Sequence, residues 1–161
     1  MTETRLTHLA KDGEVNMVNV GDKTETQRIA IAEGRINMSP KTLELIKSAN
    51  TKKGDVLAVA RVAGIMAAKK TSELIPLCHS IMLTNVDISL ELEEDHQSVF
   101  CQVTSRTTER TGVEMEALVG VQIALLTVYD MCKSVDRAME ITDVRLVHKA
   151  GGKSGEWNRE S

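Results

Sequence analysis

Residues 86–92, VDISLEL, alternate strictly between apolar and polar side chains. Because successive side chains of a β-strand point to opposite faces, this pattern predicts a strand with one buried face. The alternation returns after a turn, with Val99, Cys101 and Val103 as the apolar positions. The two segments therefore predict an antiparallel hairpin that packs on one side.

Helical and extended segments surround this hairpin. The elements that we expect, in chain order, are a strand over 27–38, helices over 41–48 and 56–70, the hairpin strands 86–92 and 99–103, a long helix over 112–138 and a strand over 141–149. This is an α+β chain with the βαββαβ order of a ferredoxin-like antiparallel sheet packed on helices, with an extra helix in the first crossover.

Three helix starts carry capping signals. Ser39 precedes a proline, and Asp55 precedes the second helix, so each supplies a side-chain oxygen at an expected N-cap. Thr111 and Glu114 have the spacing of a capping box at the start of the long helix. That interpretation explains Glu114 structurally but leaves Glu116, a second carboxylate beside the same helix start, without a structural reason.

Composition predicts one soluble domain over residues 1–161, with a flexible arm over about 1–25 and a flexible tail over about 151–161. The chain is 42% hydrophobic and 27% charged, as globular proteins are. Aromatic residues make up 2% and the net charge is −3. The core must be aliphatic, and general nucleic-acid binding, which needs a basic surface and often stacking side chains, is disfavoured.

The number of cysteines, the polar N-terminal residues and the shortness of the apolar stretches predict that the protein is cytoplasmic. Three cysteines, an odd number without CxxC spacing, argue against a disulfide framework. The N-terminal residues are polar, unlike a secretory signal. The longest apolar stretch, 123–128, is too short to cross a bilayer.

Asp130 and Lys133 lie three residues apart and share one side of the long helix. They form either a surface ion pair or, as their apolar neighbours favour, a buried pair with perturbed pKa values suited to proton transfer. Glu116 precedes Asp130 by 14 residues, or about 21 Å of helix. One small ligand can hardly touch both from a single chain, so either one group lies outside the site or two subunits share it.

Three further segments could bind a ligand. Cys78 and His79, adjacent in an extended segment, point to opposite sides and do not make a metal pair, but they lie at a helix-to-strand junction where sites occur. Residues 151–155, GGKSG, are no Walker A loop because Val147 stands where glycine is required. They are either an anion-binding turn or a basic tail. Lys53 belongs to a solvated turn or to a phosphate contact.

Several segments in fixed order together resemble a known family. They are KKGDVLAVARVAG (52–64), LIPLCHS (74–80), TGVEMEALVGV (111–121), YDMCK (129–133) and GGKSG (151–155). They are similar to the molybdenum cofactor biosynthesis protein C family, the cyclic pyranopterin monophosphate synthases. The likeness runs from Met17 to Gly155.

The resemblance implies a cyclising, pyrophosphate-releasing lyase. Its substrate would be (8S)-3',8-cyclo-7,8-dihydroguanosine 5'-triphosphate, supplied by a radical-SAM GTP cyclase, and its product cyclic pyranopterin monophosphate. The resemblance also implies a ferredoxin-like homohexamer, a trimer of dimers with sites at subunit interfaces. No cofactor is required by this expectation, although Mg²⁺ is compatible with the triphosphate and pyrophosphate.

Carried onto this sequence, the resemblance implies catalytic roles for Asp130, Lys133 and Lys53. The substrate-binding positions that it implies are Leu77, Cys78, His79, Glu114, Met115, Glu116, Lys149 and Lys153. It implies no metal ligand. The chain departs from the family pattern at Asn19, usually aspartate, at Lys52, usually histidine, and at Ser80, usually proline. The first change removes a carboxylate.

Two other hypotheses stay open on sequence grounds. One is a non-catalytic ferredoxin-like module that binds RNA or a regulatory nucleotide, which the scarcity of aromatic residues disfavours. The other is an inactive paralogue that keeps the fold as a scaffold. Asn19 supports that hypothesis, and retention of Lys53, Asp130 and Lys133 argues against it.

Overall fold

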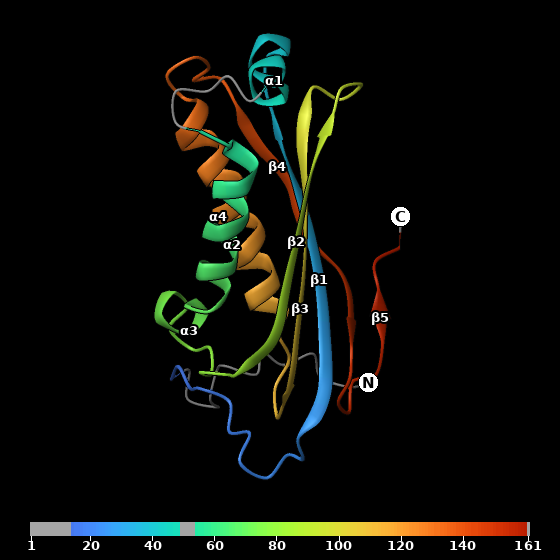
Figure 1. Ribbon diagram of the computed structural model, residues 1–161. Helices are drawn as coiled ribbons and strands as arrows, with labels where there is room; N and C mark the ends of the chain where they lie inside the picture. The colour runs from blue at the N-terminus through green and yellow to red at the C-terminus, as the bar shows by residue number, and fades with distance from the viewer. Residues whose placement is uncertain (1–13, 49–53, 161) are drawn as a thin grey trace.

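The computed structural model describes residues 14–48 and 54–160, which form a sheet covered by helices on one face (Figure 1). The elements are β1 (Thr26–Asn37), α1 (Pro40–Lys47), α2 (Val56–Ala68), α3 (Thr71–Leu74), β2 (Leu83–Glu93), β3 (Ser98–Glu109), α4 (Glu114–Cys132), β4 (Glu140–Ala150) and β5 (Trp157–Asn158). The strand order is β2-β3-β1-β4-β5, and every neighbouring pair is antiparallel. This confirms the predicted ferredoxin-like α+β fold.

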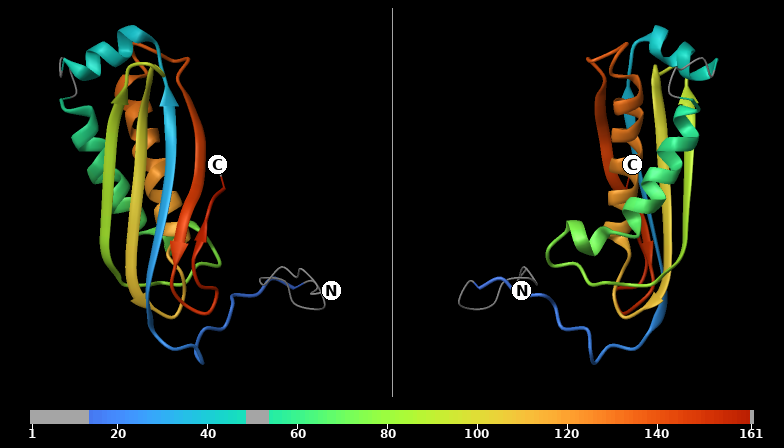
Figure 2. Two further views of the ribbon diagram at one scale, coloured as in Figure 1. Left: turned by 90° about the vertical axis from the view of Figure 1, so that its right-hand side faces the viewer. Right: turned by 60° about the vertical axis from the view of Figure 1, so that its left-hand side comes forward.

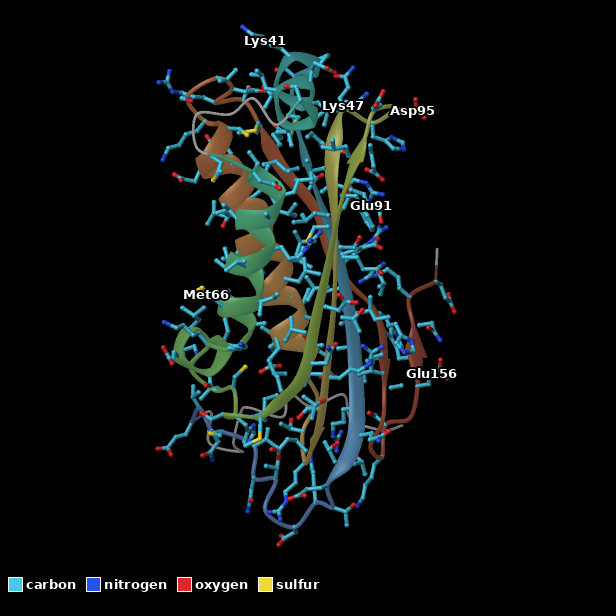
Figure 3. The ribbon with its side chains drawn as sticks, viewed as in Figure 1. Lys41, Lys47, Met66, Glu91, Asp95 and Glu156 are labelled. Atoms are coloured by element: carbon cyan, nitrogen blue, oxygen red, sulfur yellow. The ribbon has the colours of Figure 1, made fainter. Side chains whose placement is uncertain are left out.

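The predicted hairpin is present and buries the expected face. Ile88 and Leu90 of β2 are buried, while Asp87, Ser89 and Glu91 alternate with them and are exposed. The side chain of Glu91 accordingly projects from the helix-free side of the sheet (Figure 3). The alternation of β2 therefore fixes which face receives the helices (Figure 2).

Two of the three predicted caps are confirmed. Oγ of Ser39 accepts from the backbone N–H of Thr42 at 3.3 Å, and Pro40 is the first residue of α1. Oδ1 of Asp55 accepts from the backbone N–H of Ala58 at 3.0 Å at the start of α2. The Asp55 bond satisfies an amide that the first helical turn leaves without a partner, and the Ser39 bond gives a second acceptor to an amide that also donates to the carbonyl of Ser39.

The predicted capping box and the predicted end of the long helix are wrong. The N-cap of α4 is Val113, and no side chain caps it. At the other end α4 stops at Cys132, where the chain turns back. Asp136 then accepts from the backbone N–H of Ser39 at 2.8 Å and from the hydroxyl of Thr42 at 3.1 Å. This long-range tie to α1 ends the helix earlier than the apolar pattern indicates.

The core lies between the sheet and the two long helices. α4 packs against β1, β3 and β4, while α2 packs against α4 and β2. Gly64 makes the crossing of α2 and α4 close, because a Cβ there would lie 2.9 Å from the carbonyl oxygen of Gly120 and 2.6 Å from Ile88. α4 is long and apolar enough to span a membrane by length and composition, but its place as the central core helix accounts for that composition.

Two short elements were not predicted. α3 continues the crossover after α2, and β5 pairs with the end of β4, Lys149 opposite Trp157. Nδ1 of His148 contacts Oδ1 of Asn158 at 2.8 Å, and the backbone N–H of Arg159 donates to the carbonyl of Val147. The chain after the glycine-rich turn thus returns along the edge of the sheet. Flexibility of the arm and the tail stays a prediction.

Candidate functional site

A cleft of about 370 Å³ opens at the end of the molecule where α4 begins. Its walls come from the segment after α3, the first turn of α4 and the chain before β1. The lining residues are Val18, Val20, Lys23, Leu77, Cys78, His79, Ile81, Thr111, Gly112, Glu114, Met115 and Glu116. Six of the eight predicted substrate-binding residues therefore line one cavity, although they come from two segments about 35 positions apart.

His79 joins the chain before β1 to the cleft. Its Nε2 lies 2.7 Å from the backbone carbonyl oxygen of Val18. Because a carbonyl only accepts hydrogen bonds, Nε2 carries the proton in this contact. The bond fixes the ring in the cleft wall and leaves Nδ1 as the second polar atom of the imidazole.

Among the carboxyl groups of the cleft, that of Glu116 has the most strongly shifted pKa. The residue is only 4% exposed. Burial raises the pKa of its carboxyl group to about 7, and the nearby charge of Glu114 adds to the shift, although a hydrogen bond from its own backbone N–H opposes it. Burial, followed by the charge of Glu116, also raises the pKa of the Cys78 thiol. Near neutral pH, Glu116 can therefore hold or release a proton, while Cys78 remains a thiol.

Glu114 and Lys149, both predicted as substrate-binding residues, contact each other. Nζ of Lys149 donates to Oε1 of Glu114 at 2.7 Å, across from β4 to the first turn of α4. The predicted capping box does not form because the N-cap is Val113, two residues later than predicted, and the carboxylate of Glu114 lies beside Gly112 and accepts from Lys149.

A basic cavity of about 420 Å³ adjoins the cleft through Lys23, which lines both. Its other lining residues are Thr24, Thr26, Arg28, Gly152, Lys153 and Ser154, with no carboxylate among them. Gly152 has a positive φ of 72°, and a Cβ there would collide with the guanidinium of Arg28. Only glycine therefore lets the turn approach Arg28 so closely.

Polar groups in this basic cavity suit an anion. Nε and Nη2 of Arg28 donate to the carbonyls of Glu109 and Arg110, at 2.8 and 3.2 Å, which orients the guanidinium. The hydroxyl of Thr26 is buried without a hydrogen-bond partner in the described structure. Lys23, Arg28 and Lys153 supply positive charge around that hydroxyl.

Sequence reasoning predicted Lys153 here but missed Lys23 and Arg28. A signal for Arg28 existed, because it shares the period-2 face of Ala30 and Ala32, which is otherwise buried. A cation at the end of an apolar face is unusual without a partner or ligand. Lys23 lies outside any regular element, where no such periodicity applies.

Volume alone does not single out these cavities. A further cavity of about 410 Å³ is lined by Gln27, Ile29, Arg106 and other residues of the strands, and by Gly151. It contains no carboxylate, cysteine or histidine. We regard the cleft as the candidate site because its titratable groups, not its size, distinguish it.

Asp130 and Lys133 lie at the opposite end of α4, away from the cleft. Nζ of Lys133 contacts Oδ1 of Asp130 at 2.6 Å, and their side chains are 58% and 53% exposed, Asp130 first. The prediction of a largely buried pair is wrong, because the neighbouring Leu126 is itself exposed on this side of the helix. The hydrogen bond to Asp130 raises the pKa of Lys133 and keeps it protonated. The third predicted catalytic residue, Lys53, lies outside the described residues.

The model of the MoaC family matches residues 17–152 of this chain. The matched range begins beside Val18, whose carbonyl holds His79, and ends at Gly152 in the basic cavity. It contains the whole cleft and the Asp130–Lys133 pair.

Proposed function

The chain belongs to the MoaC family, and from this membership and the geometry of the two cavities we propose that it is a cyclic pyranopterin monophosphate synthase. The family consists of enzymes of molybdenum cofactor biosynthesis. The reaction that we propose converts (8S)-3',8-cyclo-7,8-dihydroguanosine 5'-triphosphate into cyclic pyranopterin monophosphate and releases pyrophosphate. The enzyme would therefore be a phosphorus–oxygen lyase.

The observation that carries this proposal is the junction of two unlike cavities at Lys23. The cleft has a buried acid with a pKa near 7 and an oriented histidine, as a purine rearrangement requires for proton transfer. The adjoining cavity has cations and an unpartnered hydroxyl, as a triphosphate requires. A ligand with a reactive ring at one end and phosphates at the other matches both.

In this proposal one group of residues transfers protons at the ring system and another group binds the phosphates. Glu116 and His79 exchange protons with the ring system in the cleft. Lys23, Arg28 and Lys153 offset the phosphate charge as the cyclic phosphate closes and pyrophosphate departs. Lys133, oriented by Asp130, is the general acid, and Lys53 assists it.

We also propose that the site is completed by a neighbouring subunit of a homohexamer, a trimer of dimers. Asp130 and Lys133 are separated from the cleft of their own chain by the length of α4, so they would serve the cleft of another copy. The outer face of α2 supports assembly, because Val59, Val62 and Met66 are 43%, 57% and 55% exposed. Met66 points away from the body of the chain (Figure 3).

The remaining expectations concern compartment and co-reactants. We propose a cytoplasmic enzyme whose substrate comes from a radical-SAM GTP cyclase, and the odd number of cysteines, three, is compatible with a reducing compartment. Any Mg²⁺ would enter with the phosphates of the substrate. The alternative, an RNA-binding module, has less support, because Arg35 covers the ring of Phe100 at 4.7 Å on the open sheet face.

The test supplies the cyclic dihydroguanosine triphosphate to the purified full-length chain. We expect stoichiometric pyrophosphate and cyclic pyranopterin monophosphate, measured by a coupled pyrophosphate assay and by mass spectrometry. A folded, assembled protein that forms neither product would exclude the proposed reaction.

A further inference from the structure

The ion pair between Glu114 and Lys149 ties up a cation at the edge of the cleft. Both side chains are only partly buried, at 27% and 28% exposed, so each remains open to solvent and to a ligand. Glu114 lines the cleft, and Lys149 stands three residues before Gly152 of the basic cavity. Lys149, the lysine of β4, therefore already pairs with an anion near both cavities. That anion is the carboxylate of Glu114, which belongs to the chain itself.

Gly112 makes this pose of Glu114 possible. A Cβ at position 112 would lie 2.8 Å from Oε1 of Glu114 and closer still to Oε2. The carboxylate is thus folded back over the backbone of Gly112, into space that any other residue would fill. Gly112 does not have a positive φ, so its backbone could accept alanine and the flexible end of Glu114 would move instead.

The pair is well suited to exchange. Because each side chain keeps a solvent-exposed part, a ligand can replace one partner without leaving either charge buried and unpaired. A phosphate oxygen with higher charge is a stronger partner for an ammonium group than a carboxylate is. A polyphosphate that enters the adjoining cavity can therefore compete with Glu114 for Lys149, whereas a weakly charged ligand gains less from the same exchange.

We propose that Glu114 is a built-in competitor for the phosphate site, which holds Lys149 in the free protein and yields it to a polyphosphate ligand. Glu114 is then a specificity-determining residue rather than a substrate ligand. It lowers the affinity for all anions, and highly charged ones overcome it most readily. The proposal rests on the proposed function for the identity of the polyphosphate, but not for the exchange itself.

The test measures binding of inorganic pyrophosphate to the full-length chain by titration calorimetry. Glu114→Gln keeps the size of the side chain and releases Lys149, so we expect pyrophosphate to bind about fivefold more tightly. Lys149→Met should weaken binding. In the Lys149→Met background, Glu114→Gln should improve binding by less than about twofold, because only the general repulsion between anions remains to be relieved.

Two further variants separate exchange from a simple loss of negative charge. Glu73→Gln removes an exposed carboxylate of α3 that lines neither cavity, and it should leave pyrophosphate binding unchanged. Gly112→Ala keeps every charge but displaces the Glu114 carboxylate, so it should tighten binding in the same direction as Glu114→Gln.

Three results would overturn the exchange. The first is unchanged or weaker pyrophosphate binding in Glu114→Gln, and the second is an equal gain in affinity from Glu114→Gln with and without Lys149. The third is no pyrophosphate binding by the parent chain or by Glu114→Gln. A chain that converts the cyclic triphosphate but lacks the gain overturns the exchange alone. A chain that shows the gain but no turnover overturns the proposed reaction alone.

Discussion

The two ends of α4 carry similar chemical groups in opposite surroundings. At its start, Glu116 is 4% exposed, and burial raises the pKa of its carboxyl group to about 7. At its end, Asp130 and Lys133 are more than half exposed, and their contact raises the pKa of the lysine. The comparison shows that enclosure, more than residue type, decides which group can exchange a proton near neutral pH.

Under the proposed function, the exposed end is an incomplete site. An exposed lysine with a raised pKa stays protonated and gains catalytic strength only when another surface excludes water from it. The enclosed end has a cavity and an acid but lacks that lysine within the described chain. In the proposed assembly, each end would supply the group that the other end lacks.

The first prediction concerns a substitution at the exposed end of α4. Lys133→Ala should lower kcat by about a thousandfold, because it deletes the proposed general acid. Thermal stability and subunit assembly should be unchanged, because exposed ion pairs contribute little to folding. Turnover measurements, circular dichroism and light scattering check these expectations. Activity close to that of the unmodified enzyme would show that the exposed end takes no part in the reaction.

The second prediction joins the two ends across subunits. Lys133→Ala and His79→Ala proteins should each be inactive, because each lacks one part of the shared site. When the two are unfolded and reassembled together in equal amounts, about a quarter of the sites should contain both intact groups and regain turnover. Reassembly of each variant alone is the control. No recovery in a verified mixed oligomer would place both groups in one chain.

The third prediction uses pH to separate the ends. Glu116 binds its proton more tightly in the folded state, so its contribution to stability is full below its ordinary pKa of 4.5 and is lost as pH rises to about 7. Glu116→Gln should remove this loss and leave the variant about 2–3 kcal/mol more stable than the parent at pH 8. Denaturant unfolding from pH 5 to pH 8 measures the difference.

The matched change at the other end is Asp130→Asn, which should produce no comparable pH-dependent gain. If Glu116→Gln were no more stable than the parent at pH 8, the carboxyl group would not be held protonated by burial, and the contrast between the two ends would lose its physical basis.

Features set by near neighbours were predictable from the sequence. The alternation of β2 and the caps Ser39 and Asp55 depend on contacts within a few residues or on one-sided burial, and all are confirmed. The separation of Glu116 from Asp130 also followed from helix geometry alone.

Features set by distant residues were not predictable in this way. Lys149 lies 35 positions from Glu114, yet it takes the carboxylate that local rules assign to a cap. Asp136 ends the helical region through a bond to Ser39, 97 positions away. The burial of Asp130 was wrongly inferred from apolar neighbours, since an apolar residue on an outer helix face, such as Leu126, shields nothing in the single chain.

The position of β1 at the centre of the sheet has a consequence for synthesis. β1 is the first strand of the sheet to be synthesised, but its two partners are β3 and β4. Asn37 pairs with Glu140, which is synthesised roughly a hundred residues later. At about 5–20 residues per second, this strand spends roughly 5–20 s with at least one edge open while the ribosome works. Until β3 emerges both edges of β1 are open, and the edge that β4 later covers stays open longer, so the apolar run 29–32 can pair with other chains. The nascent protein should therefore depend on chaperones most strongly before β4 emerges, and slower translation should increase its aggregation.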